Sequence, residues 1–270
     1  MTSTSIMQTP RLAEHGYEVI PDALTPQQVE RLSAAARLTQ EKFRDRARGY
    51  YTPRRHVLFA VQELEPAFLE PMALATTLPT VCAALGWNIF VYHSHLDQNE
   101  SLPDDVDFPF NWHRDLQGIT YTLTFPLPLL SVKVSYPLTD ITRVEDGGPL
   151  VIPGSHIGPE TPKPTGPEPP GSVPILAPAG SAIVIDSRVW HTVGANRSGS
   201  TRSTLFYAYA YRWIRPIEKY DLSPQRLAAL SPVQRQLLGA GDRYEGFHLP
   251  ETDDEVPLRR IMESGDWSAL

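Results

Sequence analysis

The residue pattern of the sequence changes near residue 106, and this change restricts the fold class that the sequence can adopt. Beyond it, short runs of β-forming residues alternate with Pro and Gly, which predicts a sandwich or barrel of short strands. We expect strands at residues 16–20, 87–96, 108–115, 119–125, 129–137, 150–152, 181–185, 189–193 and 203–211. Because the helical segments mostly precede the strands, a mainly β fold with flanking helices is favoured over alternating βαβ units.

The helical segments lie towards the two ends of the chain. Thr25-Pro26-Gln27-Gln28 is typical of a helix start, with an N-cap residue, a proline in the first turn and a capping box. It predicts a helix over about residues 26–47. A second helical region is expected over 64–86, broken at Pro79, and a third over 222–240.

Composition limits the domain organisation and the partners. With 270 residues, 41% hydrophobic and 20% charged, the chain can bury a sizeable core. We expect one domain over 1–270, with a helical N-terminal part (about 1–86), a β core (about 87–215) and a C-terminal helix and tail (216–270). The net charge of −7 argues against nucleic acid or an anionic membrane as the main partner. The sequence does not predict an oligomeric state.

Cys82 is the only cysteine, which excludes an intramolecular disulfide and a Cys-based zinc site. We recognise no signal peptide at the N-terminus and no apolar run of membrane-spanning length. A cytoplasmic protein is therefore expected.

One short stretch suggests chemistry. His113 and Asp115 are two residues apart in a predicted strand, so both side chains would point to the same side. A third ligand would complete the two-histidine, one-carboxylate facial triad that binds non-haem Fe(II) and leaves other coordination positions open. The His-x-Asp pattern alone is a weak signal, because it occurs by chance in many chains.

Among the eight histidines, His191 is the best candidate for the third ligand, since it lies in a β-like run after a Pro-Ala-Gly turn. Arg202 follows after the turn at 196–199, so a hairpin would place its guanidinium beside the metal, where it could bind a carboxylate in bidentate fashion. Thr204 would share that face and could add a hydroxyl group. The alternative for His191 is a half-buried strand histidine without a metal, and the alternative for Arg202 is an ordinary surface arginine.

Five segments in the same order resemble the phytanoyl-CoA dioxygenase family of Fe(II)/2-oxoglutarate-dependent oxygenases, over about residues 15–240. Trp112-His113-Arg114-Asp115 resembles the family's Trp-His-Gln-Asp, and the stretch from His191 to Arg202 resembles its distal histidine and 2-oxoglutarate arginine. The other three are residues 16–25, the glycine-rich block 147–156 and the helical segment 227–239.

The resemblance implies a double-stranded β-helix, a cupin-like jelly roll of two antiparallel sheets with the metal inside one end. It implies Fe(II) bound by His113, Asp115 and His191, and 2-oxoglutarate chelating this iron with its distal carboxylate on Arg202. Because related halogenases carry a small residue in place of the carboxylate ligand, Asp115 disfavours halogenation.

The chain departs from the family pattern at several positions. Arg114 replaces the usual Gln, Val193 stands where Ser is frequent, and a lysine common before the first ligand has no clear equivalent. Asn111, two residues before His113 and on the same predicted face, could donate a hydrogen bond to the co-substrate.

We therefore expect a dioxygenase that uses O2 and 2-oxoglutarate to oxidise, most simply to hydroxylate, an unactivated C–H bond of a small molecule, with release of succinate and CO2. Desaturation, cyclisation or epimerisation would need only another fate of the substrate radical. A natural-product or amino-acid-like intermediate is the expected substrate. The alternatives are a metal-dependent cupin-like isomerase, epimerase or hydrolase that does not use 2-oxoglutarate, and a relative that only binds a ligand.

The residues that contact the substrate are predicted less directly. A basic, aromatic loop over 50–56, which precedes the apolar run 57–61, is interpreted either as solvated or as facing the substrate. The proline-rich segment 157–178 could flank the site as a lid. The polar candidates and the aromatic walls are Arg54, His56, Arg114, Gln117, Tyr92 and Trp213.

Overall fold

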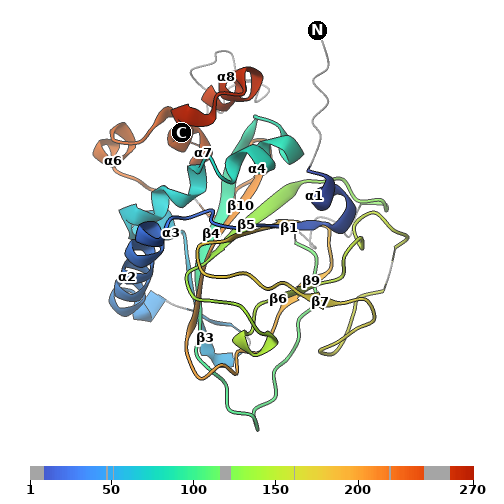
Figure 1. Cartoon of the computed structure of the whole chain (residues 1–270). Helices are drawn as coiled ribbons and strands as arrows, with labels where there is room; N and C mark the ends of the chain where they lie inside the picture. The colour runs from blue at the N-terminus through green and yellow to red at the C-terminus, as the bar shows by residue number, and fades with distance from the viewer. Residues whose placement is uncertain are drawn as a thin grey trace.

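The computed structural model describes residues 9–46, 48–50, 52–115, 123–160, 162–218, 220–239 and 256–270. Two antiparallel sheets face each other, and helices cover the outer side of the larger one (Figure 1). The larger sheet has seven strands in the order β1 (Tyr17–Ile20), β8 (Ala182–Asp186), β5 (Ser131–Pro137), β10 (Arg202–Tyr211), β4 (Ile89–Asn99), β3 (Thr52–Phe59) and β2 (Arg48–Tyr50). The smaller sheet has three, in the order β7 (Val173–Pro174), β6 (Pro149–Val151) and β9 (His191–Val193).

The α-helices of the described residues are α1 (Pro10–His15), α2 (Pro26–Lys42), α3 (Val61–Leu64), α4 (Leu78–Leu85), α6 (Pro224–Ala228), α7 (Pro232–Leu237) and α8 (Pro257–Ser264). Short 3-10 turns are η1 (Arg44–Arg46), η2 (Pro66–Leu69), η3 (Pro71–Ala73), η4 (Val144–Asp146) and η5 (Trp267–Ala269). The predicted capping box of α2 is confirmed, since Thr25 and Gln28 each bind the backbone N–H of the other. Pro79 does not break a helix as predicted. It lies in the first turn of α4, where a missing N–H costs nothing.

One strand prediction before β5 is wrong. Residues 108–115, all of them described, form no strand, and their one sheet contact is an isolated bridge between His113 and His191. Pro109 lies within this segment and cannot donate to a ladder. Of the predicted strand 119–125, only residues 123–125 are described, and they form none. Conversely, residues 52–59 are a strand, not a loop, because they pair with β4 from Arg55 to Phe59.

The main core lies between the large sheet and the helices. Three buried tyrosines of β5 and β10, Tyr136, Tyr207 and Tyr209, point towards the helical side. Their hydroxyl groups donate to the carbonyl oxygens of Pro71, Phe68 and Met72, at 2.9, 2.9 and 2.7 Å. These bonds satisfy the polar ends of large buried rings and attach the sheet to η2 and η3. Because side chains alternate along a strand, the other residues of β10 face the smaller sheet.

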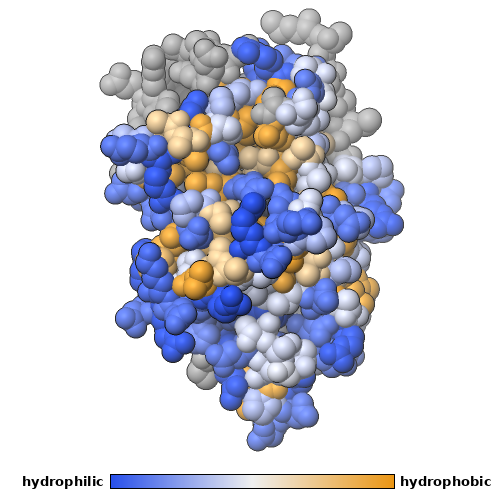
Figure 2. All heavy atoms as spheres, turned by 60° about the vertical axis from the view of Figure 1, so that its left-hand side comes forward, coloured by the Kyte–Doolittle hydropathy of each residue, from blue (hydrophilic) through white to orange (hydrophobic). Residues whose placement is uncertain are grey.

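A second apolar cluster joins the two sheets, through Val151 of β6 and Ile183 and Ile185 of β8. Figure 2 shows hydrophobic side chains in the upper and middle part of one face, with a mainly hydrophilic lower part. Among the described residues no single helix is both long and apolar enough to cross a membrane. Pro66–Ala73 and Leu78–Leu85 reach that length only as a pair bent by 58°, and many of their residues are buried in the core.

Candidate active site

A cavity of about 380 Å³ lies between the two sheets. Inward-facing residues of β3, β4, β5, β8 and β10 form its floor, and β6, β9 and the segment around residue 113 form its other wall. Most of the lining is apolar, with charged groups at two places. One holds His113, Asp115 and His191, and the other holds Arg55 and Arg202.

The two histidines are held side by side by their backbones. The N–H of His113 donates to the carbonyl oxygen of His191 at 2.9 Å, and the N–H of His191 returns the bond at 3.0 Å. Each Nδ1 lies close to a backbone carbonyl oxygen, that of Asn111 at 2.8 Å and that of Val189 at 3.0 Å. A carbonyl can only accept, so each Nδ1 carries the proton and each Nε2 keeps a lone pair.

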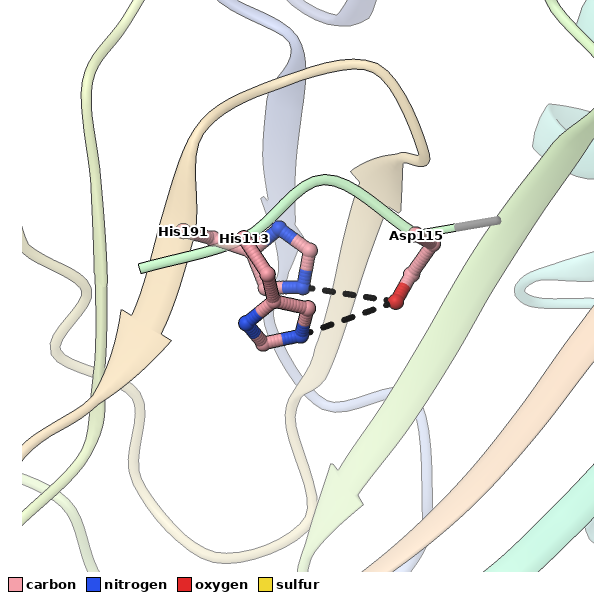
Figure 3. Close-up of side chains that lie close together, drawn as sticks. All are labelled: His113, Asp115 and His191. Atoms are coloured by element: carbon pink, nitrogen blue, oxygen red, sulfur yellow. Dashed lines mark ion pairs between the residues drawn. The ribbon is translucent and has the colours of Figure 1, made fainter. Parts of the chain in front are cut away.

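Asp115 faces both of these nitrogens. Its Oδ1 lies 3.7 Å from Nε2 of His113 and 3.7 Å from Nε2 of His191 (Figure 3). The backbone N–H of Asp115 donates to the carbonyl oxygen of Ser187 at 2.8 Å, which fixes the chain at this point. Lys133 of β5 places its Nζ 2.8 Å from Oδ1 and 2.7 Å from Oδ2 of the same carboxylate. The three donor atoms lie within 4.8 Å of one another, as a group that could hold a metal ion.

The protonation states suit a metal. Burial and the neighbouring His113 lower the pKa of His191 to about 3, and burial also lowers the pKa of His113. Burial acts to raise the pKa of Asp115, but Lys133 and the two histidines outweigh it and hold this pKa well below its usual range. At neutral pH the group therefore consists of two neutral imidazoles and a carboxylate.

The donor set fits non-haem iron. Two imidazoles and one carboxylate on one side are the ligands of the facial triad that binds Fe(II). In addition, Nε2 of His191 is buried and has no hydrogen-bond partner among the described residues. An unsatisfied buried nitrogen is costly, and coordination of a metal would relieve that cost.

Arg202 begins β10 at the other end of the cavity, 4% exposed. Its neighbour Asp97 is bound by Arg55, with Nη2 2.6 Å from Oδ2, and by the Asn99 amide at 2.7 Å. Arg202 keeps Nε and Nη1 without a hydrogen-bond partner among the described residues. Burial lowers the pKa of Arg202 to about 10, so the guanidinium remains charged at neutral pH. It could hold an anionic group in bidentate fashion.

Three other predicted residues line the same cavity. Thr204 lies two residues beyond Arg202 on β10, and Asn111 lies two residues before His113. Tyr92 also faces the cavity, because a β-bulge in β4 leaves it unpaired opposite the step from Ala208 to Tyr209.

The remaining candidates lie elsewhere. Arg54 and His56 are on the opposite face of β3 from Arg55, Val57 and Phe59 and do not line the cavity. Arg54 donates to the carbonyl oxygen of Ser101 at 3.2 Å, and His56 lies 3.5 Å from Glu100. Trp213 is 59% exposed and stacks on Tyr211, outside the lining. Gln117 lies outside the described residues.

Arg114 is buried but faces away from the cavity, as expected for a residue between two ligands in an extended segment. Its guanidinium lies 4.4 Å from the ring centroid of Trp190 and donates to the carbonyl oxygen of Ser155 at 2.9 Å. The Ser155 hydroxyl in turn accepts from the N–H of Trp190 at 2.9 Å. Arg114 thus supports the chain just before His191.

Sequence reasoning missed Lys133, Arg55 and Asp97. Each is a charged residue at an inward position of a strand, a place normally apolar, and in β4 this shows as a run of polar residues at positions 93, 95, 97 and 99. That period-two polar pattern is the signal that could have located the second charged group.

A jelly roll that encloses two histidines and a carboxylate defines a class of non-haem metal enzymes. Comparison with known proteins gives the family. The model described as phytanoyl-CoA dioxygenase (PhyH) matches residues 12–204. The dioxygenase af480 of Aspergillus fumigatus is 30% identical over 241 residues, which cover 84% of this chain and 74% of that protein.

Solved structures share the fold. HygX from Streptomyces hygroscopicus, described with nickel, 2-oxoglutarate and hygromycin B bound, has a TM-score of 0.62 and 16% identity, over 79% of this chain and 90% of its own. The epimerase SnoN, in complex with Fe3+, alpha ketoglutarate and nogalamycin RO, has a TM-score of 0.61 and 20% identity, over 91% and 94%.

The chain belongs to the phytanoyl-CoA dioxygenase family. It is a 2-oxoglutarate-dependent non-haem iron dioxygenase, and the predicted double-stranded β-helix is confirmed.

Proposed function

We propose that the enzyme oxidises, most simply hydroxylates, an unactivated C–H bond of a small natural-product or amino-acid-like intermediate, with release of succinate and CO2. One observation carries the proposal. The same cavity of about 380 Å³ holds a His-Asp-His donor set and, apart from it, a buried arginine with unpaired nitrogens. A metal at the first place and a dicarboxylate reaching the second would leave the remaining, mainly apolar volume for a substrate.

The His-Asp-His donor set and the buried arginine then have separate roles. His113, Asp115 and His191 would hold Fe(II), which with 2-oxoglutarate and O2 supplies the oxidising power for C–H cleavage. Arg202 would bind the distal carboxylate of 2-oxoglutarate, with Thr204 and Asn111 as further polar contacts.

Lys133 holds the Asp115 carboxylate in place and offsets its charge. We call His113, Asp115 and His191 the metal group. Apolar side chains that line the same cavity, among them Phe108, Phe206 and Ile185, would exclude water from the substrate volume. The chain therefore supplies the orientation and the dry surroundings that C–H oxidation requires.

The relatives support a small-molecule substrate. HygX is described with hygromycin B bound, and SnoN in complex with nogalamycin RO. SnoN is an epimerase, which keeps epimerisation as a second outcome for this chain. The family membership favours both over an isomerase that does not use 2-oxoglutarate.

Anaerobic titration of the Fe(II) protein with 2-oxoglutarate tests the proposal first. We expect a charge-transfer absorption band that is lost in His113→Ala and needs far more 2-oxoglutarate in Arg202→Ala. The absence of a band in the wild type, or an unchanged titration in Arg202→Ala, would contradict the proposal.

The reaction itself is tested with a panel of natural-product intermediates, following O2-dependent succinate formation. Mass spectrometry of the products separates a gain of one oxygen from a loss of two hydrogens or an unchanged mass. Succinate formation coupled to substrate that persists in Asp115→Ala would contradict the ligand assignment.

A further inference from the structure

Three polar side chains, Glu218, His93 and His95, form a series of hydrogen bonds that ends in the cavity and includes neither the three metal ligands nor Arg202. Glu218 binds Nδ1 of His93, and Nε2 of His93 lies 3.0 Å from Nδ1 of His95. His93 and His95 both line the cavity. None of the three has a place in the proposed handling of iron and 2-oxoglutarate.

Strand β4 determines where this series of hydrogen bonds lies. His95 faces the cavity by normal alternation, and the bulge at Tyr92 lets Tyr92 and His93 face it together. The His95 ring stacks on Phe206, with ring centroids 4.3 Å apart and planes at 9°. The imidazole is therefore held against an aromatic wall with its edge free to meet a ligand.

Glu218 is itself fixed. It follows β10, and its Oε2 accepts from the backbone N–H of Ser94 at 2.9 Å and from the hydroxyl of Tyr220 at 3.4 Å. The neighbouring Ile217 donates its N–H to the carbonyl oxygen of Tyr92 at 2.9 Å. These bonds hold the segment that carries Glu218 against β4 at Tyr92 and Ser94.

The bonding pattern determines which nitrogen of His95 carries the proton. The carboxylate of Glu218 accepts, so Nδ1 of His93 donates to it. When His93 carries this one proton, its Nε2 accepts from Nδ1 of His95. This leaves Nε2 of His95 as a bare lone pair, with no hydrogen-bond partner among the described residues. Burial, together with the positive charges of Lys133 and Arg55, lowers the pKa of His95 and keeps it neutral.

We propose that His95 is the residue that orients the substrate, that His93 and Glu218 hold it in the accepting tautomer, and that the substrate presents a hydroxyl group on an apolar or aromatic skeleton. The inference rests on the proposed function, because it concerns the volume left beside iron and 2-oxoglutarate. A hydroxyl donates to Nε2, which a carboxylate cannot do.

The surroundings of His95 favour a hydroxyl over an ammonium group. The His95 ring stacks on Phe206 and lies beside Phe59. Burying a charged donor beside aromatic rings, with only a neutral imidazole to accept from it, costs far more than burying a neutral hydroxyl.

The tautomer is tested by NMR on protein with isotope-labelled histidine, loaded with diamagnetic Zn(II) and 2-oxoglutarate. We expect His95 protonated at Nδ1 in the wild type. In Glu218→Gln, the N–H of Ser94 still requires an oxygen, so the amide nitrogen faces His93 and reverses both tautomers. A proton on Nε2 of His95 in the wild type, or the same tautomer in both proteins, would overturn the proposal.

Recognition is tested with 2-naphthol and 2-methylnaphthalene, which differ by a hydroxyl in place of a methyl group, on the same loaded protein. We expect the wild type to bind 2-naphthol about tenfold more tightly, the worth of one buried hydrogen bond. His95→Phe, which preserves the stacking on Phe206, should abolish this preference, and His95→Gln should restore part of it. The exposed Glu263→Gln is the control and should keep the wild-type preference.

Equal binding of the two probes to the wild type, or a preference that survives in His95→Phe, would overturn the inference. Affinity for 2-oxoglutarate is measured alongside and should be unchanged in His95→Phe. If the affinity for 2-oxoglutarate falls in His95→Phe by at least as large a factor as the preference for 2-naphthol, His95 serves the co-substrate and the inference fails. If the wild type binds no 2-oxoglutarate at all, the proposed function fails instead.

Discussion

Arg202 lies 3.8 Å from Asp97 but forms no hydrogen bond with it, because Arg55 and Asn99 already occupy that carboxylate. Two buried guanidinium groups therefore share one negative charge. The arrangement is a pre-formed anion site, in which the unpaired nitrogens of Arg202 face a cavity and not a protein partner. In the proposed function, a carboxylate of 2-oxoglutarate would complete this site without displacing an existing ion pair.

The first prediction concerns this arginine. Arg202→Met should raise the Kd for 2-oxoglutarate roughly 10- to 100-fold, because charged hydrogen bonds contribute about 1.5–3 kcal/mol each. Arg54→Met is the matched control, since Arg54 lies on the exposed face of β3. Titration of the Zn(II) protein by calorimetry gives both values. Similar affinities in the two variants would show that the co-substrate binds elsewhere.

The second prediction concerns the charge between the arginines. Asp97→Asn should lower the free energy of unfolding by about 3–5 kcal/mol, because it leaves two buried cations without their counter-charge. Saturating 2-oxoglutarate should then stabilise the variant more than the wild type, since the ligand restores negative charge at the site.

Urea unfolding of the Zn(II) protein, with and without 2-oxoglutarate, measures both effects. Asp104→Asn is the control, because Asp104 is almost fully exposed and its contact with Arg197 is long. If Asp97→Asn is no more destabilising than this control, Arg55 and Arg202 do not depend on the shared carboxylate.

Sequence reasoning located the residues whose order and spacing are distinctive. It grouped His113, Asp115, His191 and Arg202, and the structure brings these four into one cavity. It failed where the exact strand register determines which face of a strand a side chain occupies. Arg54 and His56 were favoured over Arg55, and a shift of one position moves a side chain to the opposite face of the strand.

Contacts between segments that are far apart in the sequence could not be predicted either. Lys133 meets Asp115 only because β5 passes beneath the metal group, and no local pattern around position 133 indicates this. Trp112 is similar, since its indole donates to the carbonyl oxygen of Gly166 at 2.9 Å and so attaches part of the proline-rich segment beside the metal group. The composition of residues 157–178 predicted that this segment could flank the site, but not which residue would attach it there.

The third prediction concerns pH. The folded metal-free protein keeps His191 neutral with a pKa of about 3, against 6.5 for an ordinary histidine. Between these values the unfolded chain binds a proton that the folded chain does not, so acid favours unfolding. The stability that depends on this group is complete above about pH 6.5 and is lost progressively as the pH falls.

Urea midpoints of the metal-free protein, measured from about pH 8 down to about pH 5, should therefore fall with acid. His191→Leu should reduce the slope, because the replacement has no proton to bind. Burial lowers the pKa of His113 and His95 as well, so part of the slope should remain. Identical slopes in the wild type and the variant would contradict the burial of a neutral His191.

The fourth prediction compares two glycines near the turn that leads into Arg202. Gly147 has φ +70°, and a Cβ on it would lie 2.6 Å from the backbone nitrogen of Asn196. Gly199 has φ +83°, and nothing lies within 4 Å of its Cβ position. Alanine at either site incurs the left-handed backbone strain of about 1–2 kcal/mol. Only alanine at position 147 must also displace a backbone segment.

Gly147→Ala should therefore lower the free energy of unfolding by roughly 3 kcal/mol or more, and Gly199→Ala by about 1–2 kcal/mol. The displaced Asn196 matters for the site, because its amide donates to the carbonyl oxygens of Asn99 and Ser200, both at 2.8 Å. These bonds join the end of β4 to the turn before Arg202, so Gly147→Ala should also weaken 2-oxoglutarate binding. Unfolding in urea and 2-oxoglutarate titration of both variants test this prediction. Equal losses of unfolding free energy would mean that backbone strain alone, and not contact with Asn196, makes glycine necessary at position 147.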